Sequence, residues 1–180
     1  GVTTLSFSGQ NADSAPSLSG LDATDRTINA ILDDASPLQQ TYSAGGAVTV
    51  NLNVDSSLVA SQTKSDNDFT LKSTNTGATT INVGSYVSSA GTLTITNSTG
   101  VSVAVDTTAI FGNTIKADKA STISVTGGSD IAATVSGAAA STMSFNVGSG
   151  TIAVGSTAIS TFSLTNSGSV QITSAVRLSG

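Results

Sequence analysis

Residues 91–106, GTLTITNSTGVSVAVD, decide the fold of this chain. Leu93 and Ile95 alternate with threonines, the polar segment NSTG interrupts the run, and three valines then alternate with Ser102 and Ala104. Alternation with a period of two places the apolar side chains on one face of an extended strand. The stretch therefore predicts a strand, a turn and a second strand, each with one apolar face.

The same strand-turn-strand unit recurs from about residue 47 to the end of the chain. Successive units are marked by the turn glycines Gly77, Gly100, Gly128, Gly150 and Gly168, which are 23, 28, 22 and 18 residues apart. These steps are near the length of one coil in a parallel β-solenoid, for which about 20–30 residues is usual. Two architectures carry such a pattern. The turns are corners between stacked coils in a solenoid, and they join antiparallel strands in a β-sandwich or jelly roll.

Composition favours the solenoid. Aromatic residues are only 4% of the chain and Trp is absent, whereas the core of a sandwich generally uses large aromatics. Charged residues are 9%, which leaves few cross-strand charge pairs to set an antiparallel register. We therefore predict an all-β protein, a β-solenoid of short irregular coils, with the β-sandwich or jelly roll as the alternative.

The N-terminal part of the chain has a different pattern. Residues 1–20 contain a short alternating run and then a polar, turn-rich segment, which predicts an arm with one short strand. The segment Leu21 to Ser36 predicts an amphipathic helix that acts as a lid, because apolar residues recur at helical spacing and Pro37 follows it. The apolar residues on the predicted helix face are Leu21, Ile28, Ile31 and Leu32. The domains expected are an arm (1–20), a capping helix with linker (21–45) and a repetitive β domain (46–180).

Charge and residue types argue against several classes of function. The net charge is −5 and the six Lys and Arg are scattered, so we expect no nucleic-acid partner. No run approaches the roughly 18 apolar residues that span a bilayer, so we expect no membrane insertion. The chain lacks His and Cys, which removes the usual zinc and copper ligands and the base for a serine nucleophile. We predict that the protein is not an enzyme and has no catalytic, cofactor-binding or metal site.

Three local patterns are weaker candidates for a site. Asp66 and Asp68, with Asn67 between them, place oxygen ligands close together for Ca²⁺, although a solvated loop is the favoured interpretation. Asn97 begins an N-glycosylation sequon in a predicted turn. The outward threonines of residues 92–96 suit an ice-binding surface, but threonine is also simply a good residue for an exposed strand.

The repeated phrases TLTITNSTG and FSLTNSGSVQI resemble the passenger repeats of secreted β-solenoid adhesins, surface-layer proteins and extracellular matrix fibres. The resemblance is to this class of proteins, covers residues 47–180 and matches no single family motif. It implies a structural or adhesive role at the cell surface or outside the cell. Low charge and the wealth of Ser, Thr, Gly and Ala agree with that location. Because the chain begins with Gly1, we expect that a leader was removed or that the numbering begins after one.

Solenoid ends expose unpaired backbone groups and a slice of the core, so they are either capped or stacked on another chain. The sequence stays strand-like through residues 169–178, and residues 2–8 are available as an additional strand. We therefore predict a structural subunit of an extracellular filament, matrix fibre or surface layer that binds copies of itself head to tail, with strand donation by the N-terminal arm. The interface residues expected are Val2, Leu5, Phe7, Val170, Ile172, Val176 and Leu178. The alternative is a monomeric adhesin that binds surface glycans; an ice-binding protein is a more remote one.

Overall fold

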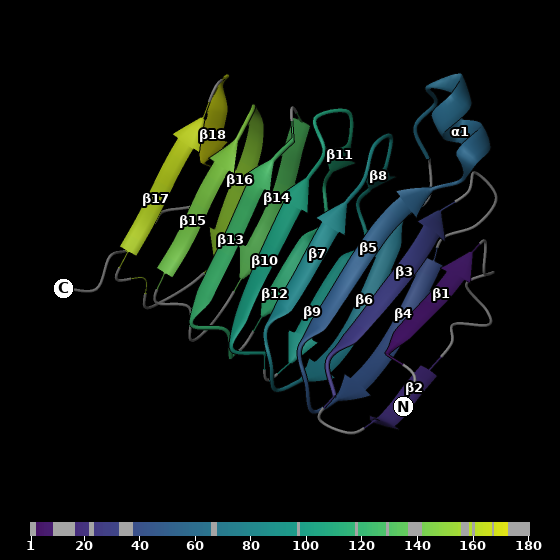
Figure 1. Cartoon of the computed structure of the whole chain (residues 1–180). Coiled ribbons are helices and arrows are strands. Elements are labelled where there is room, and N and C mark those ends of the chain that lie inside the picture. Colours follow the sequence, from purple (N-terminus) through teal and green to yellow (C-terminus); the bar gives the residue numbers. More distant parts are fainter. Residues whose placement is uncertain are drawn as a thin grey trace.

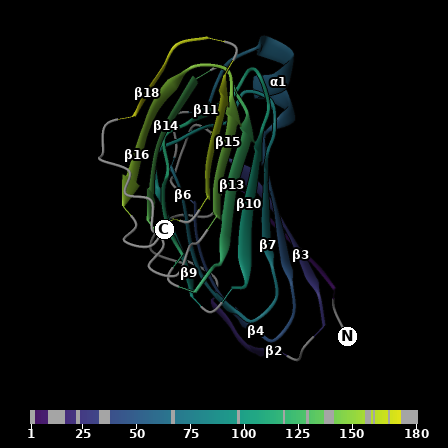
Figure 2. The ribbon, with the colours of Figure 1, turned by 90° about the vertical axis from the view of Figure 1, so that its left-hand side faces the viewer.

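The computed structural model describes residues 3–8, 17–21, 24–32, 38–65, 68–96, 98–117, 119–128, 130–136, 142–155, 159, 161–166 and 168–172. In this part of the chain the strands form two parallel sheets that face each other and run along the molecule, as Figures 1 and 2 show. Every strand pair of the described residues is parallel. The predicted β-solenoid is therefore confirmed, and the antiparallel sandwich is excluded.

The sheet nearer the viewer in Figure 1, which we call sheet A, has eight strands, and each strand pairs with the next one along the sheet. In spatial order they are β1 (Thr4–Ser8), β3 (Arg26–Leu32), β5 (Val48–Val54), β7 (Thr79–Val83), β10 (Gly100–Val105), β13 (Thr122–Gly127), β15 (Thr142–Val147) and β17 (Thr161–Asn166).

The opposite sheet, sheet B, has ten strands, of which eight form its main path. These eight are β2 (Ser17–Leu21), β4 (Leu38–Ala44), β6 (Phe69–Asn75), β9 (Thr92–Thr96), β12 (Thr114–Ala117), β14 (Asp130–Ser136), β16 (Gly150–Gly155) and β18 (Val170–Ile172). The short strands β8 (Ser88–Ser89) and β11 (Ile110–Phe111) pair beside this path. Each coil thus contributes one strand to sheet A and one to the main path of sheet B.

The stretch 91–106 shows why the turns are corners. β9 lies in sheet B and β10 in sheet A, so the segment between them carries the chain from one face to the other. Val103 pairs with Ile81 of β7 and with Val125 of β13, each 22 positions away, which is the length of one coil. The glycine spacings are irregular because the glycines occupy different corners. Gly100 is the first residue of β10 in sheet A, whereas Gly128 comes directly after β13, the sheet A strand of the next coil.

The core consists of ladders of like side chains stacked along the solenoid. The inward row of sheet A contains the buried side chains of Ile28, Val50, Ile81, Val103, Val125 and Phe145, which pair in register from strand to strand. Leu71, Leu93 and Ile115 form a corresponding row on sheet B. Burying each such side chain contributes about 1.5–3 kcal/mol, and this gain is repeated in every coil.

The helix predicted over Leu21 to Ser36 is wrong for the residues that the structure describes. Leu21 ends β2, and residues 26–32 form β3, which pairs with β1 on one side and β5 on the other. Arg26 occupies an inward, buried position while Ile31 faces outward and is only partly covered. Because a charged residue lies at an inward position and an apolar residue at an outward one, the sequence of β3 does not alternate between apolar and polar residues. Its apolar residues instead recur at a spacing that is typical of a helix.

The helix of the described chain, α1 (Ser56–Ser61), lies in the polar segment between β5 and β6. The Asp55 carboxylate caps it by accepting a hydrogen bond of 2.8 Å from the Ser57 N–H, and Gln62 ends it with a left-handed φ of 55°. Leu58 is buried against the core, so this helix covers the corner of one coil. It lengthens that coil to 31 residues between paired positions of β5 and β7.

Candidate functional site

The outer face of sheet A carries side chains in rows that the parallel register aligns. One row is made only of hydroxyl residues, one from every strand of the sheet. Its members are Thr4, Thr27, Thr49, Thr80, Ser102, Ser124, Ser144 and Ser163. Within it the Ser124 hydroxyl lies 3.3 Å from the Ser102 hydroxyl. The row gives sheet A an uncharged polar stripe along its described length.

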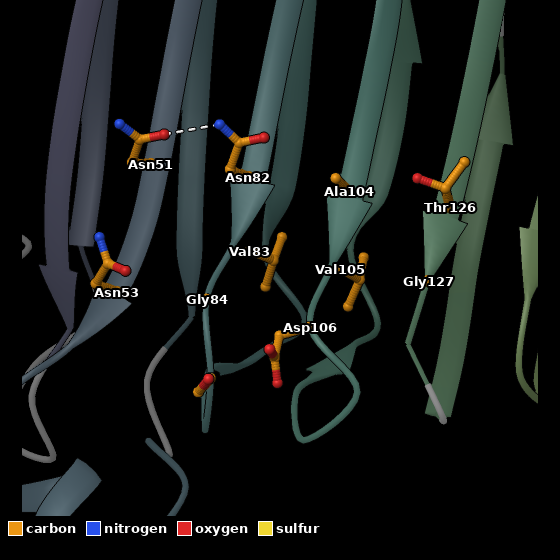
Figure 3. A pocket seen from close by; sticks show the side chains of 11 residues that line it. Asn51, Asn53, Asn82, Val83, Gly84, Ala104, Val105, Asp106, Thr126 and Gly127 are labelled. Atoms are coloured by element: carbon orange, nitrogen blue, oxygen red, sulfur yellow. Dashed lines mark hydrogen bonds between the residues drawn. The ribbon is translucent and has the colours of Figure 1, made fainter.

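The neighbouring outward row begins at Ser6 and continues as a ladder of asparagines. The Asn51 Nδ2 donates to Asn29 Oδ1 at 2.9 Å, and the Asn82 Nδ2 donates to Asn51 Oδ1 at 2.8 Å. Ala104 holds the next position of the row, so the ladder stops there, and Thr126 follows on β13. Figure 3 shows the Asn51–Asn82 bond and the short side chain of Ala104 beside it.

The end of the ladder opens into a surface pocket of about 570 Å³. Its floor is the outer surface of β7, β10 and β13, and the segments that follow β7 and β10 form one side (Figure 3). The lining residues are Asn51, Asn53, Asn82, Val83, Gly84, Ser85, Ala104, Val105, Asp106, Thr126 and Gly127. The lining thus combines carboxamides, two hydroxyls and a single carboxylate around small apolar groups.

Asp106 is the charged group of this pocket. Its Oδ1 accepts hydrogen bonds from the Thr108 N–H at 2.8 Å and from the Thr108 hydroxyl at 2.7 Å. The bond from the Thr108 backbone lowers the pKa of Asp106 most, below its usual value of 3.8. Hydrogen bonds from the side chains of Thr108 and Ser85 lower this pKa further. The carboxylate is therefore ionised at neutral pH and acts as a fixed hydrogen-bond acceptor.

This arrangement is suited to binding. Among the described residues, no group of three His, Cys, Asp or Glu side chains comes together in a way that would hold a metal ion. The pocket contains hydrogen-bond donors and acceptors on a shallow surface. Such a lining offers hydrogen-bonding groups to a ligand.

The predicted interface residues lie toward opposite ends of the solenoid. Leu5 and Phe7 belong to β1 at one edge of sheet A, and Val170 and Ile172 belong to β18 at the far edge of sheet B (Figure 1). Leu5 is partly buried against the core. The structure does not bring the two groups together within one chain. The remaining predicted interface residues, Val2, Val176 and Leu178, lie outside the described residues.

The structure describes only some residues of the possible calcium, glycosylation and ice-binding sites. Asp66 and Asn97 lie outside the described residues, so the calcium site and the glycosylation site stay predictions. The Asp68 Oδ1 accepts a hydrogen bond of 2.8 Å from the Ala90 N–H. The outward Thr94 lies between Lys72 and Lys116 of the adjacent strands, so charges interrupt its row on sheet B. The ice-binding function also stays a prediction.

Sequence reasoning missed the pocket residues Asn51, Asn82 and Asp106. A signal was present in the recurring triplet of a threonine, an aliphatic residue and an asparagine, which occurs at residues 27–29, 49–51 and 80–82. The unequal spacing of the triplets, 22 and then 31 residues, concealed their alignment because α1 lies between the second and the third.

Comparison with known proteins finds no matching family model, no matching curated protein and no matching solved structure. In the part of the chain that the structure describes, no helix is long and apolar enough to cross a membrane.

Proposed function

We propose that the protein is a structural subunit of an extracellular or cell-surface assembly, such as a filament, matrix fibre or surface layer, that polymerises by head-to-tail stacking. The observation that carries the proposal is the pair of outer strands of sheet A. β1 and β17 are the first and last strands of its order, and each pairs with a single strand of the described chain. The other side of each strand presents backbone N–H and C=O groups that another parallel strand is able to pair with.

The side chains of the two outer strands are compatible with such a junction. Leu5 and Leu164 are the end members of the inward row that runs through Ile28 and Val103. Both are only partly buried, and Phe162 beside Leu164 is partly buried too. Placing β1 of one copy against β17 of the next in the continuing register stacks leucine on leucine. It also removes apolar surface from water.

The outward rows continue across the same junction. Thr4 of one copy follows Ser163 of the other in the hydroxyl row, and Ser6 follows Thr165 in the neighbouring row. In sheet B, β18 and β2 are likewise the two ends of the strand order, so both sheets extend together. A contact between different ends of identical subunits is heterologous and propagates into a linear polymer.

The role of the N-terminal arm follows from its position. β1 pairs with β3 of its own chain, which fixes one side of the strand. Its second side is the one that meets the neighbouring copy, so β1 lies between two subunits in the proposed polymer. Val2, Val170, Ile172, Val176 and Leu178 complete the proposed interface. The low charge and the wealth of Ser, Thr, Gly and Ala support a location outside the cell.

Disulfide trapping tests the proposed register because the natural chain has no Cys. Thr4 and Ser163 are exposed and lie on opposite outer strands, so Thr4→Cys with Ser163→Cys leaves the core unchanged. We expect mild oxidation to give a ladder of covalent oligomers in denaturing electrophoresis. The matched control is Thr4→Cys with Ala132→Cys, because Ala132 is exposed on the outer face of sheet B.

Two results would contradict the proposal. One is a ladder that forms no faster in the first variant than in the control. The other is a natural chain that sediments as a monomer over the whole concentration range and shows no polymers by electron microscopy. The monomeric adhesin would then be the better interpretation.

A further inference from the structure

We infer that the pocket at Ala104 binds a neutral saccharide unit. The pocket lies on the lateral face of sheet A, away from the outer strands β1 and β17, so this inference does not depend on the proposed polymer (Figure 3). It assigns a ligand class to a site built from the end of the asparagine ladder.

The outward row changes residue type at Ala104. Asn51 and Asn82 each use Nδ2 to donate to the Oδ1 of the preceding asparagine, and Asn82 is the last member of the ladder. Asn82 Oδ1 points toward the Ala104 position in Figure 3, where an alanine side chain offers no donor. A ligand that places a hydroxyl above Ala104 takes the position of the next carboxamide in the row. An acceptor left without a donor costs about 1–3 kcal/mol when it is desolvated, so the hydroxyl must donate to it.

Two further polar groups of the pocket lie near Ala104. Asp106 adds a carboxylate on one side of the pocket, and Thr126 adds a hydroxyl across from Asn82. The Thr126 hydroxyl donates to the Val103 carbonyl at 3.4 Å, which leaves its oxygen available as an acceptor. A suitable ligand therefore carries several hydrogen-bond donors at short intervals. The hydroxyl groups of a sugar ring meet this requirement.

The charge and shape of the pocket restrict the class of ligand. The lining contains no Lys or Arg and has one ionised carboxylate, so an anionic ligand is repelled. Ala104, Gly84 and Gly127 contribute a methyl group and glycine backbone to the surface, on which the C–H face of a sugar ring can pack. The volume of about 570 Å³ lies in the range of small-molecule pockets. A neutral monosaccharide or disaccharide fits these conditions.

The experiment measures binding by chemical shift changes in ¹H–¹⁵N spectra of the full chain. The probes are the methyl glycosides of glucose, mannose, galactose and N-acetylglucosamine, each titrated to about 20 mM in EDTA. We expect at least one of them to shift the amide signals of Gly84, Asp106 and Gly127, with a Kd of about 1 mM because the pocket is shallow. Methyl glucuronide should bind at least several-fold more weakly than methyl glucoside.

The deciding variant is Ala104→Asn, which extends the ladder and fills the pocket. We expect it to weaken binding at least 10-fold while the rest of the spectrum stays unchanged. Ala132→Asn is the matched control, because it adds the same group at an exposed position of sheet B and should bind as the natural chain does. The inference is overturned if none of the four neutral probes shifts these signals, or if Ala104→Asn binds as tightly as the control. Binding that appears only when Ca²⁺ replaces EDTA also overturns it.

Discussion

Replacing Gly91 with alanine should destabilise the protein by about 2–4 kcal/mol, a large effect for one methyl group. A Cβ at Gly91 would lie 2.2 Å from the Phe69 carbonyl oxygen and 2.7 Å from the carbonyl carbon. Both atoms belong to the backbone of the adjacent coil, so neither can rotate away. Forcing a methyl group into a well-packed interior of this kind costs about 1–3 kcal/mol.

A second contribution comes from Asn113, which lies one coil beyond Gly91. Its Nδ2 donates to the Phe69 carbonyl at 3.0 Å, a bond between residues 44 positions apart. The Asn113 side chain is buried, so moving the Phe69 carbonyl leaves a buried donor without its acceptor, at a cost of about 1–3 kcal/mol. The two costs involve the same carbonyl group, and we therefore expect their sum to be less than additive.

Gly112→Ala is the matched control. A Cβ at Gly112 would lie 3.6 Å from the Ala90 Cβ and from the Ser89 carbonyl oxygen, which is ordinary contact. The Gly112→Ala substitution should lower the free energy of unfolding by no more than about 0.5–1 kcal/mol. Urea unfolding followed by circular dichroism gives the two free energies of unfolding. Amide exchange in β6, β9 and β12 shows whether the loss is local, since stacked coils can open separately.

Equal urea midpoints for Gly91→Ala and Gly112→Ala would show that the close approach of Gly91 to the Phe69 carbonyl does not limit stability. The double variant of Gly91→Ala with Asn113→Ala provides a further check. It should be more stable than the sum of the two single effects predicts, because either change alone already breaks the same hydrogen bond.

Two other predictions follow from hydrogen bonds of the described residues. Thr79→Val should lower the free energy of unfolding by about 1–2 kcal/mol, because the buried Thr79 hydroxyl makes hydrogen bonds of 3.2 Å with Asn75 and with Ser98. Urea unfolding measures this change, and an unaltered midpoint would contradict the prediction. Asp106 has a lowered pKa, so its contribution to stability is present above the unfolded value near 3.8 and is lost as the pH falls through the folded value. Asp106→Asn should therefore lose less thermal stability below pH 4 than the natural chain does, as thermal unfolding at a series of pH values would measure. An identical acid transition in the variant and the natural chain would show that the Asp106 carboxylate plays no part.

The sequence by itself predicted most of the strands that follow residue 47 and the buried face of each. A period of two is a local property, so Leu93 and Ile95 are inward and buried as the pattern predicts, and so are the valines of β10. The same local pattern failed at β3. There Arg26 takes a buried position and Ile31 an outward one, and only the pairing with β1 and β5 makes that segment a strand.

Tertiary structure decided which residues become neighbours on the outside. Asn51 bonds Asn82 only because α1 is inserted between their strands without shifting the register, and nothing local to either residue shows this. The pocket arises in the same way, since Ala104 leaves space only in relation to Asn82 and Thr126 on the adjacent coils. Side-chain direction is fixed by the backbone of each strand, whereas the rows are fixed by how successive coils stack. Side-chain direction can therefore be predicted from the sequence, whereas the members of each row are known only from the folded molecule.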